Sequence, residues 1–169
     1  MKKFLIILIL ILIPVKSFGL IEVDITRGNL NPLPIAVSPL SIDEGSRKNF
    51  QNILKKKNIG SEISSIVENN LKVSGLFNPL NKDAFLQEPD IANLKPRFED
   101  WNLIKAQALI TGKVSYVEEK LRVEFRLWDV LAGKEMMALA FTTVPNNWRR
   151  VGHIITDKVY ERLTGEKGY

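Results

Sequence analysis

The feature that most restricts the fold of this chain is an alternation of apolar and charged residues over positions 121–130. One side of the extended chain carries Leu121, Val123, Phe125 and Leu127. The other side carries Arg122, Glu124 and Arg126. This period of two is typical of a strand with one buried and one wetter face. The chain is therefore expected to build a sheet and to cover one side of it.

Strand-length segments lie on both sides of this alternation. Residues 108–117 and 136–144 are rich in apolar residues, and the short polar stretches 118–120 and 132–134 separate them from the central strand. Turns this short predict an antiparallel meander, in which Gly112 is a possible bulge. An earlier apolar run, residues 35–40, predicts a further buried strand that Pro39 ends.

Two main amphipathic helices are predicted by apolar stripes at the helical period. The first has Asn58 as a candidate N-cap and Gly75 after its end, and its stripe is Ile59, Ile63, Ile66, Val67 and Leu71. The second begins after Asn147 and closes at Gly165, and its stripe is Val151, Ile154, Ile155, Val159 and Leu163. A shorter helix over 97–104 would place Phe98, Trp101 and Ile104 on one side.

The remaining segments of the body have no clear period. We predict a solvated loop or a frayed extra turn over residues 41–57 and an apolar turn over residues 76–80. The fold class is then α/β of the α+β kind, with a single mixed β-sheet of about five strands flanked by two main α-helices. This domain would occupy residues 34–169.

The first nineteen residues have the three-part layout of a secretory signal peptide. Lys2 and Lys3 precede an unbroken apolar run over 4–13, and small residues place the cleavage site between Gly19 and Leu20. The alternative is a membrane anchor, for which the run is about half the ~20 residues required. We therefore expect export through a Sec-type pathway to the periplasm, without membrane insertion after cleavage.

Removal of residues 1–19 changes the charge balance. The chain has a formal charge of +5, but the mature part would keep 21 basic against 19 acidic residues, or about +2. That balance argues against a nucleic-acid partner.

The predicted mature N-terminus is an alternating segment. Apolar Ile21, Val23 and Ile25 would share one face of a strand, while Glu22, Asp24 and Thr26 occupy the rest of it. Residues 27–33 are rich in turn-forming residues and predict a flexible connector, so that residues 20–33 form a strand on a linker. A strand attached in this way can leave its own sheet.

No pattern predicts catalysis, a cofactor or a metal site. The sequence has no Cys and a single histidine, His153, for which a surface or packing role is expected. The adjacent carboxylates at 118–119 and 99–100 diverge on regular elements and make no acid/base pair. Trp148, Arg149 and Arg150 can be either a helix start or part of a protein interface.

Four stretches of the sequence resemble the amino-terminal domain family of TolB, from the periplasmic Tol-Pal system. They are residues 34–37 (PIAV), 74–80 (SGLFNPL), 123–129 (VEFRLWD), and a last stretch from 148–153 (WRRVGH) to 160–169 (YERLTGEKGY). The last of these is long and specific.

The resemblance implies a mixed sheet flanked by two helices and followed by a six-bladed β-propeller. The chain ends at Tyr169, where the propeller would begin, so we expect a fragment or a truncated relative. Contacts with a Pal-like lipoprotein and with colicins belong mainly to the propeller in this family.

For the remaining domain the resemblance implies a non-enzymatic role. In the family, residues just after the cleavage site bind the inner-membrane protein TolA, and the matching positions are Ile21 to Thr26. The predicted function is a protein-binding part of a system that supports outer-membrane integrity and invagination during cell division. The alternative is a structural accessory domain that packs against a propeller through Trp148, Arg149 and Arg150.

Overall fold

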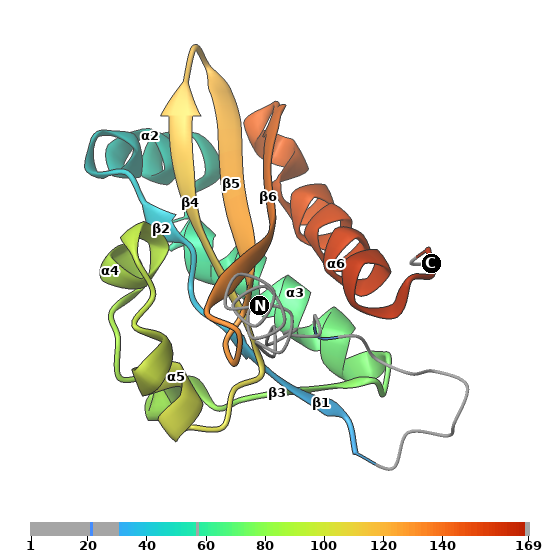
Figure 1. Cartoon of the computed structure of the whole chain (residues 1–169). Coiled ribbons are helices and arrows are strands. Elements are labelled where there is room, and N and C mark those ends of the chain that lie inside the picture. The colour runs from blue at the N-terminus through green and yellow to red at the C-terminus, as the bar shows by residue number, and fades with distance from the viewer. Residues whose placement is uncertain (1–20, 22–30, 57, 168–169) are drawn as a thin grey trace, which may run out of the picture.

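A computed structural model describes residues 21, 31–56 and 58–167, and it places them in one open sheet with helices on both faces (Figure 1). The strands are β1 (Leu33–Val37), β2 (Ser41–Ile42), β3 (Phe77–Pro79), β4 (Ala108–Val117), β5 (Lys120–Asp129) and β6 (Lys134–Thr143). Their order is β3-β1-β4-β5-β6, and β2 pairs with β4 off this path.

The sheet is mixed, as the sequence predicts. Strand β1 runs parallel to β3 and β4, whereas β4, β5 and β6 form the expected antiparallel meander. The turn between β4 and β5 places Glu118 and Glu119 at φ angles of 48° and 60°. Two successive left-handed residues match the right-handed twist of a tight hairpin.

The helices are α2 (Glu44–Leu54), α3 (Ile59–Val73), α4 (Pro89–Leu94), α5 (Phe98–Leu103) and α6 (Trp148–Thr164). Figure 1 shows α3 and α6 on one side of the sheet and α4 and α5 on the other. The two main helices match the predicted ones, and Gly75 and Gly165 end them with φ angles of 73° and 76°. None of the helices in these described ranges is long and apolar enough to cross a membrane.

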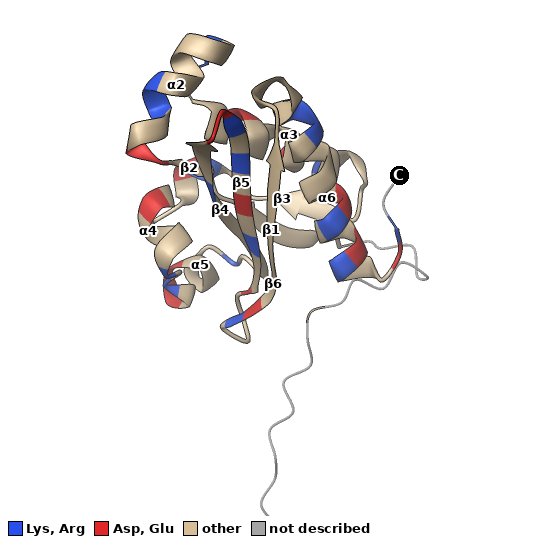
Figure 2. Cartoon of the chain, turned by 90° about the horizontal axis from the view of Figure 1, so that it is seen from above, with Lys and Arg blue, Asp and Glu red and all other residues tan. Residues whose placement is uncertain are grey.

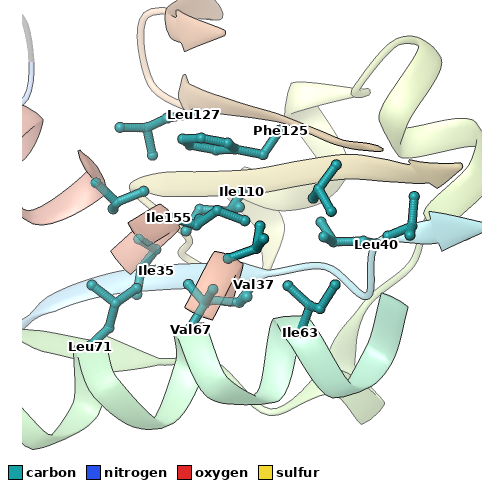
Figure 3. Close-up of a cluster of buried hydrophobic side chains, with 14 of the residues drawn as sticks. Ile35, Val37, Leu40, Ile63, Val67, Leu71, Ile110, Phe125, Leu127 and Ile155 are labelled. Carbon is teal, nitrogen blue, oxygen red and sulfur yellow. The ribbon is translucent and has the colours of Figure 1, made fainter. Parts of the chain in front are cut away.

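The main core lies between the sheet and the pair α3 and α6. Figure 3 shows side chains of both helices and of the sheet converging on this layer, among them Ile63, Val67, Ile110, Phe125 and Ile155. Each of these five side chains is at most 2% exposed. The inward residues of β5 are all buried as predicted, and in the two helical stripes only Ile66 and Ile154 are half-buried rather than buried.

The prediction of a solvated loop or a frayed extra turn over residues 41–57 is wrong, because this stretch contains β2 and the eleven-residue helix α2. The hydroxyl of Ser46 donates to Asp43 Oδ2 at 3.1 Å and accepts from the Tyr116 amide at 2.8 Å. Phe50 is 1% exposed and packs edge-on against Tyr116. The helix thus depends on contacts with β4, about 70 residues away, which a local pattern does not reveal.

Two further local expectations are corrected. Within residues 76–80, Phe77–Pro79 form a strand, because they pair with β1 in parallel. Gly112 is not a bulge, since pairing is continuous there and the register shift falls between Leu127 and Trp128. A Cβ at Gly112 would lie 2.3 Å from the Glu124 carbonyl oxygen, so glycine is needed there for space.

Candidate functional site

Of the predicted partner-binding segment, the structure describes Ile21. Its amide donates to Asp129 Oδ2 at 3.3 Å, and its half-buried side chain packs against the main core. Glu22, Val23, Asp24, Ile25 and Thr26 lie outside the described residues, as do Gly19 and Leu20 of the predicted cleavage site. The partner-binding segment and the cleavage site stay predictions.

Asp129 is a buried anchor for two backbone amides. It is 1% exposed, and its Oδ1 accepts from the amide of Ala132 at 2.8 Å, in the turn between β5 and β6. Its second oxygen receives the amide of Ile21. Charge-assisted bonds from backbone amides stabilise a buried carboxylate. Ile21, near the beginning of the predicted mature chain, is thus tied to the end of β5.

The predicted interdomain patch divides into a buried and an exposed part. Trp148 is 6% exposed and belongs to the main core. The Arg149 guanidinium carbon lies 4.3 Å from the centre of its ring, and the Lys56 ammonium lies 5.6 Å from it. Arg149 and Arg150 are exposed at the start of α6. The surface here is cationic, and its use as an interface stays a prediction.

The other titratable residues considered in the sequence analysis do not lie together in one site. His153 is exposed on α6, and its Nδ1 lies 2.8 Å from the Asn70 amide nitrogen. Asp100 of α5 pairs with Arg97, the N-cap residue of that helix, at 2.6 Å, whereas Glu118 and Glu119 lie in the hairpin turn. Over the described ranges no group of three His, Cys, Asp or Glu side chains is placed to hold a metal ion.

One surface feature that sequence reasoning missed is a groove between α3 and α6. Polar residues of both helices line it, among them Asn70, His153, Thr156 and Asp157. The available signal was Gly152, a small residue in the middle of an amphipathic helix, which is typical of close helix packing. The pattern of each helix separately does not say which polar flanks face one another.

Comparison with known proteins gives matches over most of the chain. The TolB amino-terminal domain family matches residues 21–136. The Tol-Pal system protein TolB of Pelagibacter ubique (strain HTCC1062) is 82% identical over 162 residues, which are 96% of this chain and 36% of that relative. The chain thus spans little more than a third of the length of that curated relative.

Solved structures share the fold at lower identity. TolB from Acinetobacter baumannii superposes with a TM-score of 0.62 at 23% identity, covering 82% of this chain and 30% of that one. The hypothetical protein CT253 from Chlamydia trachomatis superposes with a TM-score of 0.50 at 11% identity, covering 80% and 100%. At these identities the two structures bear on the fold alone.

Proposed function

Because this chain belongs to the TolB amino-terminal domain family, we propose that it serves as a protein-binding domain of a Tol-Pal-type system in the periplasm. Within that role it binds a TolA-like inner-membrane partner through residues 21–26. The system supports outer-membrane integrity and invagination during division. The observation that carries the proposal is the family match, which begins at Ile21 and so includes this segment.

The mechanism is the addition of a strand to a partner's sheet. Main-chain hydrogen bonds supply affinity in such complexes, and alternate side chains enter pockets. Ile21, Val23 and Ile25 are the apolar anchors, whereas Glu22 and Asp24 set the register or steer the encounter. Before the strand can pair fully, the bond from the Ile21 amide to Asp129 has to break. Release and partner binding are then coupled as a shift between two populations.

The first test compares residues 20–169 with residues 27–169 by calorimetric titration into a TolA-like periplasmic domain. Only the longer chain is expected to bind, while both give the same circular dichroism spectrum. Equal binding by the two chains would place the interface elsewhere and end the strand-addition mechanism.

A matched pair of variants sharpens this test. Val23→Asp puts a charge on the apolar side of the segment and should abolish measurable binding, whereas Glu22→Gln removes a charge from the other side and should weaken it by roughly fivefold or less. The reverse order of effects would show that charge, rather than apolar anchoring, holds the partner.

A further variant tests whether the hydrogen bond between the Ile21 amide and Asp129 competes with partner binding. Asp129→Asn keeps an acceptor for the Ala132 amide but replaces the second carboxylate oxygen with a donor, which cannot accept from Ile21. The docked segment is then weakened, and partner affinity should rise. An unchanged affinity would mean that the Ile21 contact does not compete with partner binding.

The cationic surface around Trp148 favours a second candidate function. Arg149 and Lys56 lie over the ring of a tryptophan that is already packed in the core, and Arg150 is exposed beside them in the chain. Lys56 is paired with Glu62 at 2.7 Å, so the two arginines are the cations that can contact another domain without exposing Trp148. In this alternative the domain is a structural accessory to a β-propeller, which also contacts a Pal-like lipoprotein. It predicts that neither of the two chains above binds a TolA-like partner.

A further inference from the structure

The groove between α3 and α6 begins where the two helices touch. A Cβ added at Gly152 would lie 2.9 Å from Ile66 Cγ2, so the backbone of α6 lies directly against this side chain. Beyond this contact, toward the C-terminal ends of both helices, the surfaces of α3 and α6 separate and leave a groove of about 510 Å³. Its walls are the surface flanks of α3 and α6, the two helices that Figure 1 shows on the same side of the sheet.

The floor of the groove is well packed, whereas its rim is open. Thr156 is 7% exposed, and the half-buried Tyr160 ring packs edge-on against Phe77 at 6.1 Å between ring centres. At the rim, Val73 is 77% exposed. The groove therefore combines an aromatic wall and an exposed apolar side chain with polar groups from both helices.

The hydrogen bonds between α3 and α6 decide which polar atoms of the groove are already used as donors and which remain as acceptors. The Thr156 hydroxyl donates to the Gly152 carbonyl at 3.0 Å, so it accepts from the Asn70 amide nitrogen at 3.3 Å. That orientation makes the Asn70 amide a donor toward His153 Nδ1 as well, at 2.8 Å. In this bond His153 Nδ1 is the acceptor. The Asn70 amide protons are used, and its carbonyl oxygen is left as an acceptor.

Other groups of the groove have the same bias toward accepting. The Ser74 hydroxyl donates to the Leu71 carbonyl at 2.6 Å and accepts from the Leu76 amide at 3.4 Å, which leaves one of its two lone pairs available. Among the described residues of the lining, Asp157 is the one with a formal charge, and it forms no ion pair with a described residue. Its neighbour Lys158 is already paired with Glu161 at 2.8 Å. The groove thus presents a carboxylate and several acceptors beside an aromatic ring.

We propose that this groove binds a segment of a partner protein through a lysine or arginine side chain and an adjacent apolar residue. A cation with several N–H donors satisfies Asp157 and the acceptors of Asn70 and Ser74, and the Tyr160 ring favours it further. The volume exceeds what one guanidinium fills, and exposed Val73 offers a contact for the apolar neighbour. None of the described residues that line the groove belongs to the 21–26 segment, and the proposal does not depend on the proposed strand addition.

The test uses ¹⁵N-labelled full chain, expressed with its own N-terminus so that any leader is processed as in the cell. Acetyl-arginine methylamide is titrated in, with the citrulline derivative as its uncharged isostere. Amide shifts at Asn70, Ser74, His153 and Asp157 are expected to move with the arginine probe and to respond at least fivefold more weakly to citrulline. Equal responses, or shifts centred elsewhere on the domain, would overturn the proposal.

A matched pair of variants distinguishes binding at the Asp157 carboxylate from attraction of arginine by the overall charge of the domain. Asp157→Asn should weaken arginine binding by about fivefold, the upper end for one exposed ion pair. Asp90→Asn, an exposed carboxylate on α4 at the other face of the sheet, should leave it unchanged. If both variants weaken binding to the same extent, arginine is attracted by net charge and the groove is not its site.

A second probe distinguishes a partner segment from a free cation. Acetyl-arginyl-leucine methylamide adds one apolar residue and should bind at least threefold more tightly, with Val73 among the shifted amides. If the leucine adds nothing, the groove takes a simple cation and the assignment to a partner segment is wrong.

Discussion

The two faces of the sheet differ in how far they are covered by helices and in which side chains they carry. One face meets α3 and α6 in a continuous apolar layer that reaches from β1 to β6. The other face has a smaller cluster where Trp101 of α5 meets Ala36 and Leu109. Beyond that cluster it carries Arg122, Glu124 and Arg126 beside the exposed Ala138 and Ala140, and Figure 2 shows the alternating charges along β5.

This difference assigns stability mainly to one face. Burial of apolar area is the dominant favourable contribution to folding, at roughly 25 cal/mol per Å². The exposed charge pairs of the other face contribute about 0–1 kcal/mol each. Substitutions on the two faces should therefore differ in scale, and the following four predictions test that order.

The largest effect is expected for Phe125→Ala, on the covered face. Phe125 is 0% exposed, and its removal should lower the free energy of unfolding by about 3–5 kcal/mol. Its register partner on β6, Leu139, faces the same side but is 37% exposed, so Leu139→Ala should cost clearly less. Urea denaturation followed by circular dichroism measures both. Equal losses would show that the apolar layer stabilises the fold as much at the edge strand β6 as at β5.

A middle-sized effect is expected for Gln87→Ala, under the smaller cluster. The Gln87 side chain accepts from Trp101 Nε1 and from the Arg97 amide, and it donates to the Lys95 carbonyl, each at 3.0 Å. Unpaired buried groups should cost about 1–3 kcal/mol in the same assay. Exposed Glu88, next to it, is the control, and Glu88→Ala should be near neutral. A near-neutral Gln87→Ala would mean that water replaces the lost partners.

A small effect is expected where the second face is open. Arg126 Nε lies 3.4 Å from Glu135 Oε2, and both side chains are at least one-third exposed. A double-mutant cycle of Arg126→Ala and Glu135→Ala should give a coupling energy below about 1 kcal/mol that falls with added salt. A coupling of 2 kcal/mol or more would place this face among the stabilising parts of the fold.

The smallest effect is a pH dependence at the edge of α2. The hydrogen bond from Lys113, and then that from Ser46, holds the pKa of Asp43 below its ordinary value. A lowered carboxyl pKa adds stability above the unfolded pKa, and that stability is lost as pH falls through the folded pKa. The difference in unfolding free energy between the native chain and Asp43→Asn should therefore shrink below about pH 4. A constant difference down to pH 2 would contradict this assignment.

Local sequence patterns predict some elements of this domain much better than others. The alternation at 121–127 and the stripes of α3 and α6 predicted their buried residues almost one by one. The prediction for residues 41–57 failed because Phe50 is the one fully buried apolar residue of α2, and its ring partner, Tyr116, comes from β4. The interaction partners of residues 21–26 are equally invisible to such patterns, and the structure ties one of them, Ile21, to Asp129.

By itself, the sequence determined the meander, the two main helices and the family, because each depends on short periods or on residues that lie close together in the chain. The tertiary structure alone decided that β3 pairs with β1 and that α2 forms on β4. It also decided that the flanks of α3 and α6 meet in a groove. These features need contacts between residues that are distant in the chain, and the energy of such contacts appears only once the sheet has brought them together.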